Sequence, residues 1–310
     1  MMNKHIGEKI ELNRYEDDLF SFLSSVFLGL RGSSSSSRHS VYVFGGWVRD
    51  KLLSRLSCDF DICVPKKVIG PFLDALQEAD PGVKVNPIKL DEFPKIGHML
   101  YNVHIKRLRA RLGITALEID LERELLSKDF TANSLCYDVV KRQLVRNKAT
   151  ERGLSDLRQG ILDVNTKCET SLGRSPSRII RLIRLSLSHN LAISDKIVAY
   201  FKSLNQRKRL PVLNNSLINQ FQKLVKYVNN EKKHLGRFME LIKLFRIDKL
   251  ITVWFNYSRR MIVLFLVKDN LHTLKQLFID DMIEKGQHYV TINSDLRTLC
   301  HYQSKYSQSA

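Results

Sequence analysis

The segment VYVFGGWVRDKLLSRLSCDFDICVP, Val41–Pro65, restricts the fold more than any other part of the sequence. An apolar run enters a Gly-Gly pair, a short basic amphipathic stretch follows, and Asp59 and Asp61 then alternate with apolar residues. This order predicts a buried strand, a turn into a helix, and a second strand that ends at the proline. Because side chains alternate across a strand, the two carboxylates are expected to share one face.

The paired aspartates predict a metal site. Two neighbouring carboxylates repel each other, and burying either one without compensation costs free energy. A divalent cation removes both problems, and hard carboxylate oxygens suit Mg²⁺, which also binds substrate phosphates. Two such ions activate an attacking hydroxyl and stabilise a leaving pyrophosphate. Asp59 and Asp61 are therefore the predicted catalytic and metal-binding pair, and the alternative is a solvated Asp-x-Asp at a strand edge.

The Gly-Gly pair predicts a phosphate site beside these carboxylates. Gly45 and Gly46 offer backbone N–H groups at the start of the following helix, which is a favourable place for phosphate oxygens. Arg49 lies on the first turn of that helix and is positioned in the sequence to meet the same phosphates.

A chain of 310 residues is long enough for two or three domains. Along the sequence we predict four consecutive parts. Residues 1–40 hold an N-terminal helix and a flexible Ser-rich loop, and residues 41–140 mix strands with helices. Residues 141–200 form a junction that ends in a helix, and residues 201–310 form a helical body rich in Lys and Arg. The individual elements predicted are helices at 8–31, 47–56 and 71–79 and strands at 41–46, 59–65, 100–108 and 115–121.

The charge of the chain indicates a polyanionic partner. There are 50 Lys and Arg against 32 Asp and Glu, a net charge of +18. Such a surplus attracts nucleic acid first and an anionic membrane surface second, while a merely basic surface is the plain alternative. The sequence has no apolar run of about 18 residues, so we expect no membrane-spanning helix.

Cysteine usage and the N-terminal segment bear on the compartment. Five cysteines are scattered without CxxC spacing, which predicts reduced thiols. The first residues lack the apolar region of a signal peptide. We therefore expect a cytoplasmic protein, with an organelle as the alternative.

The motifs resemble a known family. G-G-x-V-R-D followed by D-x-D resembles the head domain of class II tRNA nucleotidyltransferases (CCA-adding enzymes) and bacterial-type poly(A) polymerases, which belong to the polymerase-β-like nucleotidyltransferases. Three later segments resemble the family in the same order, and together the motifs cover about residues 41–195: LERELLSKDFTANSLCYD, ERGLSDLRQGILDV and RSPSRIIRLIRLSLSHNLAI. The resemblance implies an α+β polymerase-β-like head domain followed by an all-helical neck and body.

The resemblance also implies roles for individual residues. Asp59 and Asp61 would hold a two-metal Mg²⁺ site, and Asp129 would lie near the ribose 2′-hydroxyl of the incoming nucleotide. A third metal carboxylate stays open between Glu118 and Asp120. The nucleotide-binding residues implied are Gly45, Gly46, Arg49, Lys128, Asp129, Arg178, Arg181 and Arg184.

Two departures from the family motifs concern nucleotide binding. The family's double arginine before D-F-T is Ser127-Lys128 here, and lysine supplies charge without a planar fork. The family's acidic pair at the base-reading helix is Arg174-Ser175, and a serine hydroxyl does not replace a carboxylate acceptor. The departures leave base selection open.

The function implied by the resemblance is template-independent transfer of nucleotides to an RNA 3′ end. The expected reaction adds CCA, or part of it, to tRNA from CTP and ATP and releases pyrophosphate. A poly(A) polymerase of the same family and a catalytically weakened RNA-binding relative are the alternatives. The expected partners are the tRNA 3′ end, CTP and ATP, with no membrane and no obligate protein partner.

Overall fold

The structure is a computed structural model, and it describes residues 9–30, 40–89, 99–173, 176–205, 220, 223–224, 227–228, 231 and 234–245. The chain forms two compact units, Met1–Ser171 with Leu191–Ile197, and Leu172–Asn190 with Val198–Ala310. The four-part division predicted from the sequence stays a prediction. The departures at Arg174 and Ser175 lie outside the described residues.

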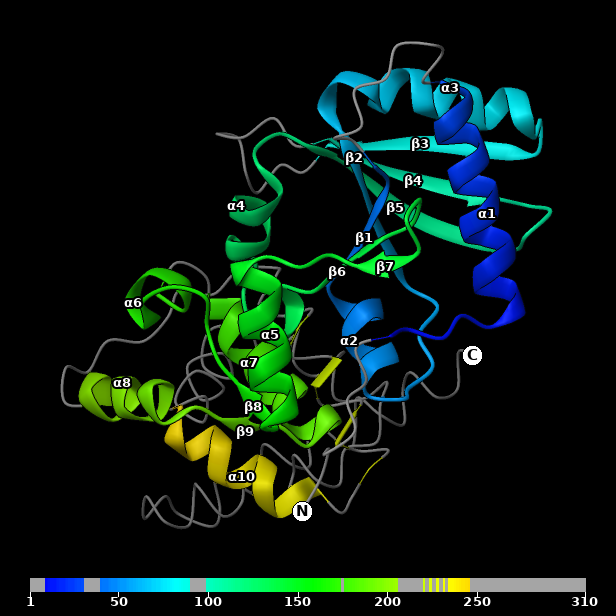
Figure 1. Ribbon diagram of the computed structural model, residues 1–310. Coiled ribbons are helices and arrows are strands. Elements are labelled where there is room, and N and C mark those ends of the chain that lie inside the picture. Colours follow the sequence, from blue (N-terminus) through cyan, green and yellow to red (C-terminus); the bar gives the residue numbers. More distant parts are fainter. Residues whose placement is uncertain are drawn as a thin grey trace. The chain divides into compact units, whose positions relative to one another are not determined.

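The first unit is built on a seven-stranded sheet in the order β3-β4-β5-β2-β1-β6-β7 (Figure 1). Every neighbouring pair is antiparallel except β2 and β5, which run parallel. The strands are β1 (Tyr42–Phe44), β2 (Phe60–Pro65), β3 (Val83–Lys89), β4 (Met99–Ile105), β5 (Ala110–Leu117), β6 (Cys136–Asp138) and β7 (Gln143–Leu144). A separate parallel pair joins β8 (Ile161–Leu162) to β9 (Ala192–Ile193).

Helices connect and cover these strands. The α-helices of the first unit are α1 (Arg14–Gly29), α2 (Gly46–Leu52), α3 (Ile69–Ala79), α4 (Leu121–Leu126), α5 (Lys148–Arg158) and α6 (Cys168–Ser171). Two 3₁₀ turns, η1 (Lys66–Val68) and η2 (Thr131–Asn133), complete the connections. A capping box between Asn13 and Glu16 starts α1, because each side chain accepts a hydrogen bond from the other's backbone N–H.

An aromatic cluster lies between one face of the sheet and helix α1. Trp47 of α2 is fully buried, and its ring lies 5.1 Å from that of Phe20 and 5.8 Å from that of Phe60. Tyr137 of β6 joins the same cluster, with its ring 5.7 Å from that of Trp47. These contacts bury large apolar area, and the Trp47 contacts with Phe20 and Tyr137 are edge to face, which fixes α1 and α2 against the sheet.

The opposite face of the sheet is covered by α4 and α5. Tyr42, Phe44 and Cys63 form a buried cluster there with Leu125 of α4 and Ala149 of α5. The sheet therefore has an apolar layer on each face, as expected of an α+β fold. This predicted fold class is confirmed in the described part of the chain.

The strands predicted at residues 41–46, 59–65 and 100–108 correspond to β1, β2 and β4, while other strands were displaced or missed. The strand expected at residues 115–121 is displaced, because β5 spans Ala110–Leu117 and its buried alternation begins at Ala110. Strand β3 was not predicted, since Pro87 interrupts its pattern. A proline is tolerated there because β3 lies at the edge of the sheet.

The second unit is helical in its described part. It contains α7 (Pro176–His189), most of α8 (Asp195–Asn205) and α10 (Leu235–Leu244). Phe201 packs edge to face on Phe245 with 4.5 Å between ring centroids, and the Tyr227 hydroxyl donates to the Leu187 carbonyl at 3.2 Å. None of the described helices has the length and apolar character that crossing a membrane requires.

Candidate active site

The paired aspartates lie at the start of β2. Asp61 is the second residue of the strand, and Asp59 is the residue directly before the strand begins. Both are exposed. Phe60 and Ile62 are buried, so the alternation of burial is the one predicted. The two acidic side chains are therefore presented on one side of β2 while the strand contributes its apolar side to the core.

Two neighbouring strands flank Asp61, one on each side of β2. Asp61 is paired in register with Phe44 of β1 and with Gly113 of β5. A methyl group at Gly113 would lie 3.5 Å from Oδ1 of Asp61, so the glycine keeps the β5 side of the carboxylate clear. Hard oxygen donors on an exposed strand face fit a divalent cation that completes its shell with water and phosphate.

Neither candidate for a third metal carboxylate lies beside the pair. Glu118 and Asp120 follow the end of β5, whose last residue, Leu117, is paired with Pro65. With a rise of about 3.3 Å per residue, that end lies roughly 13 Å along the sheet from Asp61. The sequence analysis placed both residues on a strand, whereas β5 ends before them at Leu117.

The side chains of Glu118 and Asp120 each interact with another group of the protein. Glu118 forms an ion pair with Lys66 at 2.7 Å, and the Asp120 side chain caps α4 by accepting a hydrogen bond from the Arg123 backbone N–H at 3.2 Å. Within the described ranges, no group of three or more His, Cys, Asp or Glu side chains is arranged to hold a metal ion. The metal-binding hypothesis therefore depends on Asp59 and Asp61.

Gly45 forms the turn between β1 and α2. Its φ of +65° lies in the left-handed region, which glycine adopts without strain. Its N–H donates to the Leu135 carbonyl at 3.0 Å, and its own carbonyl accepts from the Arg49 N–H at 3.0 Å. The backbone N–H of Gly45 is thus committed within the protein, in contrast to the expectation of two available amides, while Gly46 begins the helix.

Arg49 is buried and held in place by two neighbours. Its Nη1 donates to Oδ1 of Asn133 at 2.6 Å, and its Nε donates to Oδ1 of Asp50 at 2.9 Å. Nη2 also pairs with the Asp50 carboxylate at 2.8 Å. Only 6% of Arg49 is exposed, so these contacts fix the guanidinium before any ligand binds.

Asp129 is joined to Arg49 through Asn133. Oδ1 of Asp129 accepts hydrogen bonds from Nδ2 of Asn133 at 2.8 Å and from the Phe130 N–H at 2.9 Å. The amide of Asn133 therefore bridges the two residues that the sequence predicted separately. The sequence analysis did not select Asn133, although its position four residues after Asp129 in the D-F-T-A-N segment was a usable signal.

Lys128 lies on the same face of the sheet as Asp61. Its Nζ forms an ion pair with Glu124 at 2.8 Å and lies 4.9 Å from the centroid of the Phe44 ring. Phe44 is the residue paired with Asp61 across β1 and β2. A cation over an aromatic ring is attracted by the ring's negative face, which keeps positive charge near the start of β2.

The cysteines near this face are unreactive. Cys63 and Cys136 are buried in the cluster beneath α4, and burial raises the pKa of the Cys63 thiol to about 12. Burial also raises the pKa of Cys136 well above its ordinary value. Cys58 and Cys168 are free thiols too, in agreement with the prediction, and Cys300 lies outside the described residues.

The three predicted arginines of the later motif lie on α7 in the second unit. Arg178, Arg181 and Arg184 are half-buried, at intervals of three residues, as the sequence indicates. The apolar residues between them are buried and form the inner side of this helix.

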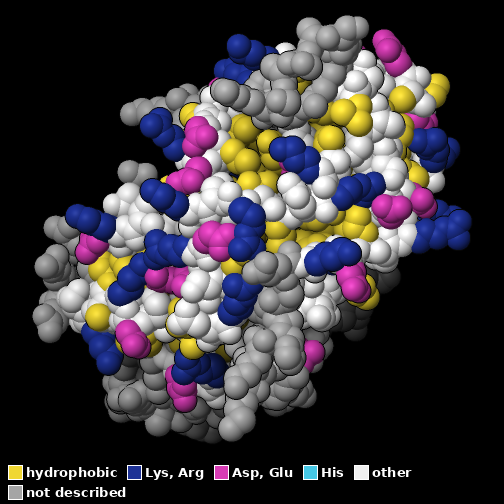
Figure 2. All heavy atoms as spheres, in the orientation of Figure 1, with side chains coloured by type: hydrophobic (Ala, Val, Ile, Leu, Met, Phe, Trp, Pro, Cys, Tyr) yellow, Lys and Arg dark blue, Asp and Glu magenta, His cyan; other side chains and the backbone are white. Residues whose placement is uncertain are grey.

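The basic residues do not form a single patch on the face of the molecule that Figure 2 presents. Lys and Arg side chains of the described residues are scattered there and interleaved with Asp and Glu. On this face, the described residues therefore form no continuous basic surface.

Comparison with known proteins gives a match in the region that contains the paired aspartates. Residues 41–163 match the family described as the poly A polymerase head domain. This range begins at β1, and it includes the Gly-Gly turn, β2 and the η2 loop.

Curated relatives are found among fungal enzymes. The mitochondrial CCA tRNA nucleotidyltransferase of Saccharomyces cerevisiae is 26% identical over 215 residues, which cover 62% of this chain and 39% of the relative. The tRNA nucleotidyltransferase cca1 of Schizosaccharomyces pombe is 25% identical over 254 residues, which cover 72% of this chain and 48% of the relative. The chain spans less than half of the length of these relatives.

Solved structures share the fold. A CCA-adding enzyme in complex with ATP aligns with a TM-score of 0.57 and 22% identity, covering 75% of this chain and 52% of the other. The Thermotoga maritima CCA-adding enzyme complexed with tRNA aligns with a TM-score of 0.55 and 21% identity, covering 75% of this chain and 53% of the other.

Proposed function

We propose that this chain, whose head domain belongs to the poly A polymerase head-domain family shared with class II tRNA nucleotidyltransferases, adds nucleotides to the 3′ end of tRNA. The observation that carries the proposal is the exposed pair Asp59 and Asp61 at the start of β2, next to the turn that opens α2. Two neighbouring carboxylates repel each other, and a bound cation relieves that repulsion.

The pair would bind Mg²⁺, with substrate phosphates and water as further ligands. When bound, the metal lowers the pKa of the attacking 3′-hydroxyl and stabilises the leaving pyrophosphate. Asp59 and Asp61 would hold the ions on one face of β2. Lys128, above the Phe44 ring, adds positive charge on this face for the triphosphate.

Arg49, Asn133 and Asp129 would orient the nucleotide. Asp129 is proposed to accept a hydrogen bond from the ribose 2′-hydroxyl, which a deoxyribose lacks. Because Arg49 is already held by Asp50 and Asn133, it would serve the site by fixing this network as well as by contributing charge. Gly45 and Gly46 would shape the turn beside the phosphates.

The arginines of α7 are proposed to contact the nucleotide as well. Arg178 is assigned to the base, and Arg181 and Arg184 to the phosphates. The assignment follows from the resemblance of this helix to the family's base-reading segment and from the shared, half-buried side on which the three lie.

The substrate class follows from the relatives. Two of them are named as tRNA nucleotidyltransferases, so we propose CTP and ATP as donors and a tRNA lacking part of its CCA end as acceptor. Poly(A) addition by the same site is the second candidate, since residues 41–163 match a family that is named after it. A cytoplasmic location is proposed, with an organelle as the alternative, because the S. cerevisiae relative is named as mitochondrial.

One assay separates these possibilities. CTP and ATP, one of them labelled, are offered together with Mg²⁺ to tRNA that lacks its CCA end, with Asp59→Ala as the inactive control. Addition of two C residues and one A supports the CCA activity, while long A tracts on unrelated RNA support the second candidate. Binding of RNA without any incorporation would overturn the proposed transfer activity and favour an RNA-binding protein.

A further inference from the structure

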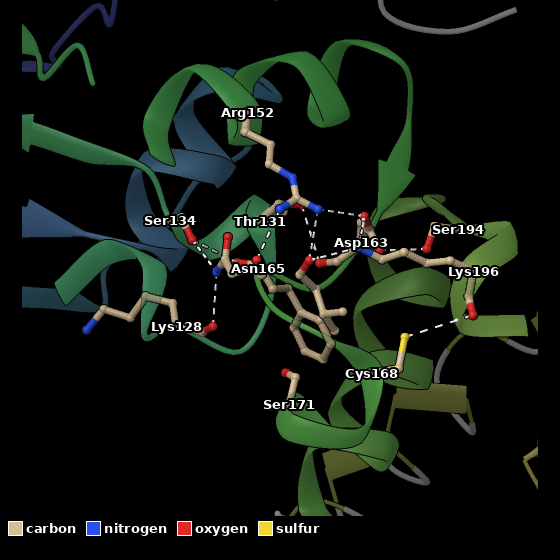
Figure 3. Close-up of polar contacts among 12 residues, drawn as sticks. Lys128, Thr131, Ser134, Arg152, Asp163, Asn165, Cys168, Ser171, Ser194 and Lys196 are labelled. Carbon is tan, nitrogen blue, oxygen red and sulfur yellow. Dashed lines mark hydrogen bonds and ion pairs between the residues drawn. The ribbon is translucent and has the colours of Figure 1, made fainter. Parts of the chain in front are cut away.

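The loop that carries Lys128 and Asp129 is hydrogen-bonded to a segment that has no role in the proposed function. This loop, residues 128–134, contacts the segment that follows β8, residues 163–171 (Figure 3). In Figure 3, Lys128 and Ser134 approach Asn165 from one side, while Arg152, Ser194 and Lys196 surround Asp163.

Three groups of the segment fasten the loop directly. The Asp163 carbonyl accepts from Thr131 N–H at 2.9 Å and from its hydroxyl at 3.3 Å. Nδ2 of Asn165 donates to the Lys128 carbonyl at 3.0 Å and to Oγ of Ser134 at 2.7 Å. The Ser171 hydroxyl donates to the carbonyl of Asp129 itself at 3.2 Å.

Arg152 of α5 fixes the shape of this segment. Its Nη2 donates to Oδ2 of Asp163 at 2.9 Å and to the Val164 carbonyl at 3.0 Å, and its Nη1 donates to the Asn165 carbonyl at 3.1 Å. One planar guanidinium thus binds three consecutive residues. A lysine has no such fork, so charge alone does not reproduce the arrangement.

The Asp163 carboxylate is the second fixed point. It is buried, it pairs with Lys196 at 2.7 Å, and it accepts from the Ser194 hydroxyl at 2.7 Å. Two cations and a hydroxyl therefore satisfy one carboxylate, while the backbone of the same residue holds Thr131. A buried charge with this many partners is costly to disturb, so its backbone position is well defined.

We propose that Arg152, Asp163 and Asn165 are positioning residues for ribose selection. They set the place of Asp129 by fastening the loop on both sides of it, at Lys128 and at Thr131. The inference rests on the proposed function, in which Asp129 contacts the 2′-hydroxyl. A hydrogen bond to a charged group requires close distance and alignment, so a small displacement of Asp129 weakens discrimination between ribonucleotides and deoxyribonucleotides.

The test measures kcat/KM for CTP and for dCTP on tRNA lacking its CCA end. The full chain is compared with Asn165→Ala, Arg152→Met and Arg152→Lys. The matched control is Glu151→Gln, since Glu151 neighbours Arg152 on α5 but forms its ion pair with the exposed Arg146. Thermal unfolding of each variant separates loss of stability from loss of selection.

We expect Asn165→Ala and Arg152→Met to reduce the CTP to dCTP ratio by roughly tenfold or more, the factor associated with a hydrogen bond to a charged group. Arg152→Lys should lose most of the ratio as well, because it keeps the charge but not the fork. The control should keep the wild-type ratio. Incorporation of dCTP should fall less than that of CTP in each affected variant.

A lowered melting temperature with an unchanged CTP to dCTP ratio would overturn the inference and leave the segment a purely structural role. An equal loss for both nucleotides would overturn it too, since ribose selection would then not depend on this segment. These results differ from a failure of the proposed function, in which the wild-type chain incorporates neither nucleotide.

Discussion

Asp59 and Asp61 are exposed at the start of β2, whereas Asp129 is buried under hydrogen bonds from its own loop, although all three are acidic residues of one head domain. The first pair lies on the exposed side of β2. The second site is held by Asn133, and through it by Arg49. Removing an exposed carboxylate should therefore affect chemistry alone, while changing the buried network should affect chemistry and stability together.

The largest expected effect comes from the exposed pair. Asp59→Ala or Asp61→Ala should reduce nucleotide incorporation by roughly a hundredfold or more, since metal-assisted charge stabilisation contributes several kcal/mol. The melting temperature should stay the same or rise slightly, because two like charges no longer repel. Single-turnover incorporation of labelled CTP and a thermal melt provide the two measurements.

The control for this prediction is Glu118→Gln. Glu118 pairs with Lys66 at the far end of β5, so this variant should keep wild-type incorporation. A loss as large as that of Asp59→Ala would show that Glu118 does serve the metal site. A substantial drop in stability for Asp59→Ala would contradict the contrast between the exposed and the buried acidic residues.

The second effect concerns the buried network. Asn133→Ala removes the amide that bridges Arg49 and Asp129, which leaves buried polar groups without one partner each. Such a loss costs about 1–3 kcal/mol in unfolding free energy. Urea unfolding should show this loss, and incorporation of CTP should fall with it.

A matched change elsewhere makes the second prediction specific. Asn102→Ala removes an exposed asparagine from β4 of the same sheet and should change neither quantity by more than a few tenths of a kcal/mol. Equal stability of the Asn133 and Asn102 variants would show that the bridge contributes nothing to the fold.

The contrast also explains what the sequence could predict. Alternation around Phe60 and Ile62 and the glycine pair before α2 are local patterns, so the strand, the turn and the shared face of the two aspartates followed from them. The end of β5 was misplaced because the sequence T-A-L-E-I-D-L alternates as well as the true strand does. Local pattern alone does not reveal which of two overlapping alternations finds a partner strand.

The contacts behind Asp129 could not be predicted for a different reason. Arg152, Asp163 and Asn165 come from α5 and the segment after β8, and they meet the loop at residues 128–134 only in the folded chain. Nothing in the spacing of these residues indicates a shared ion pair. Networks that depend on long-range backbone placement require the structure.

A third, smaller effect depends on pH. Burial raises the pKa of Asp163, but hydrogen bonds from Lys196 and Ser194 lower it by more, so its net pKa lies below the ordinary value. A carboxyl with a lowered folded-state pKa stabilises the fold above its unfolded-state pKa of about 3.9, and this contribution is lost as pH falls through the folded-state pKa.

Asp163→Asn should therefore be less stable than the wild type near neutral pH, and the difference should shrink below about pH 4. The change is measured by urea unfolding of both proteins at about pH 6.5, well above the unfolded-state pKa, and at about pH 3, which lies below it. A difference that is the same at both pH values would show that the charge of Asp163 does not contribute. Asp59→Asn, which changes an exposed carboxylate, serves as the comparison.

The smallest expected effect comes from Lys128, which directly precedes Asp129 in the sequence. Its side chain is 29% exposed, and its ammonium pairs with Glu124 and lies over the Phe44 ring, on the face that also presents Asp61. A partly exposed ion pair contributes at most about 1 kcal/mol, so Lys128→Met should change the unfolding free energy only slightly. If its charge meets the triphosphate, KM for CTP should rise several-fold, with a smaller change in kcat. Lys128→Arg keeps the charge and should retain most of the wild-type KM, whereas an equal loss in both variants would place the role of Lys128 in its packing against Phe44.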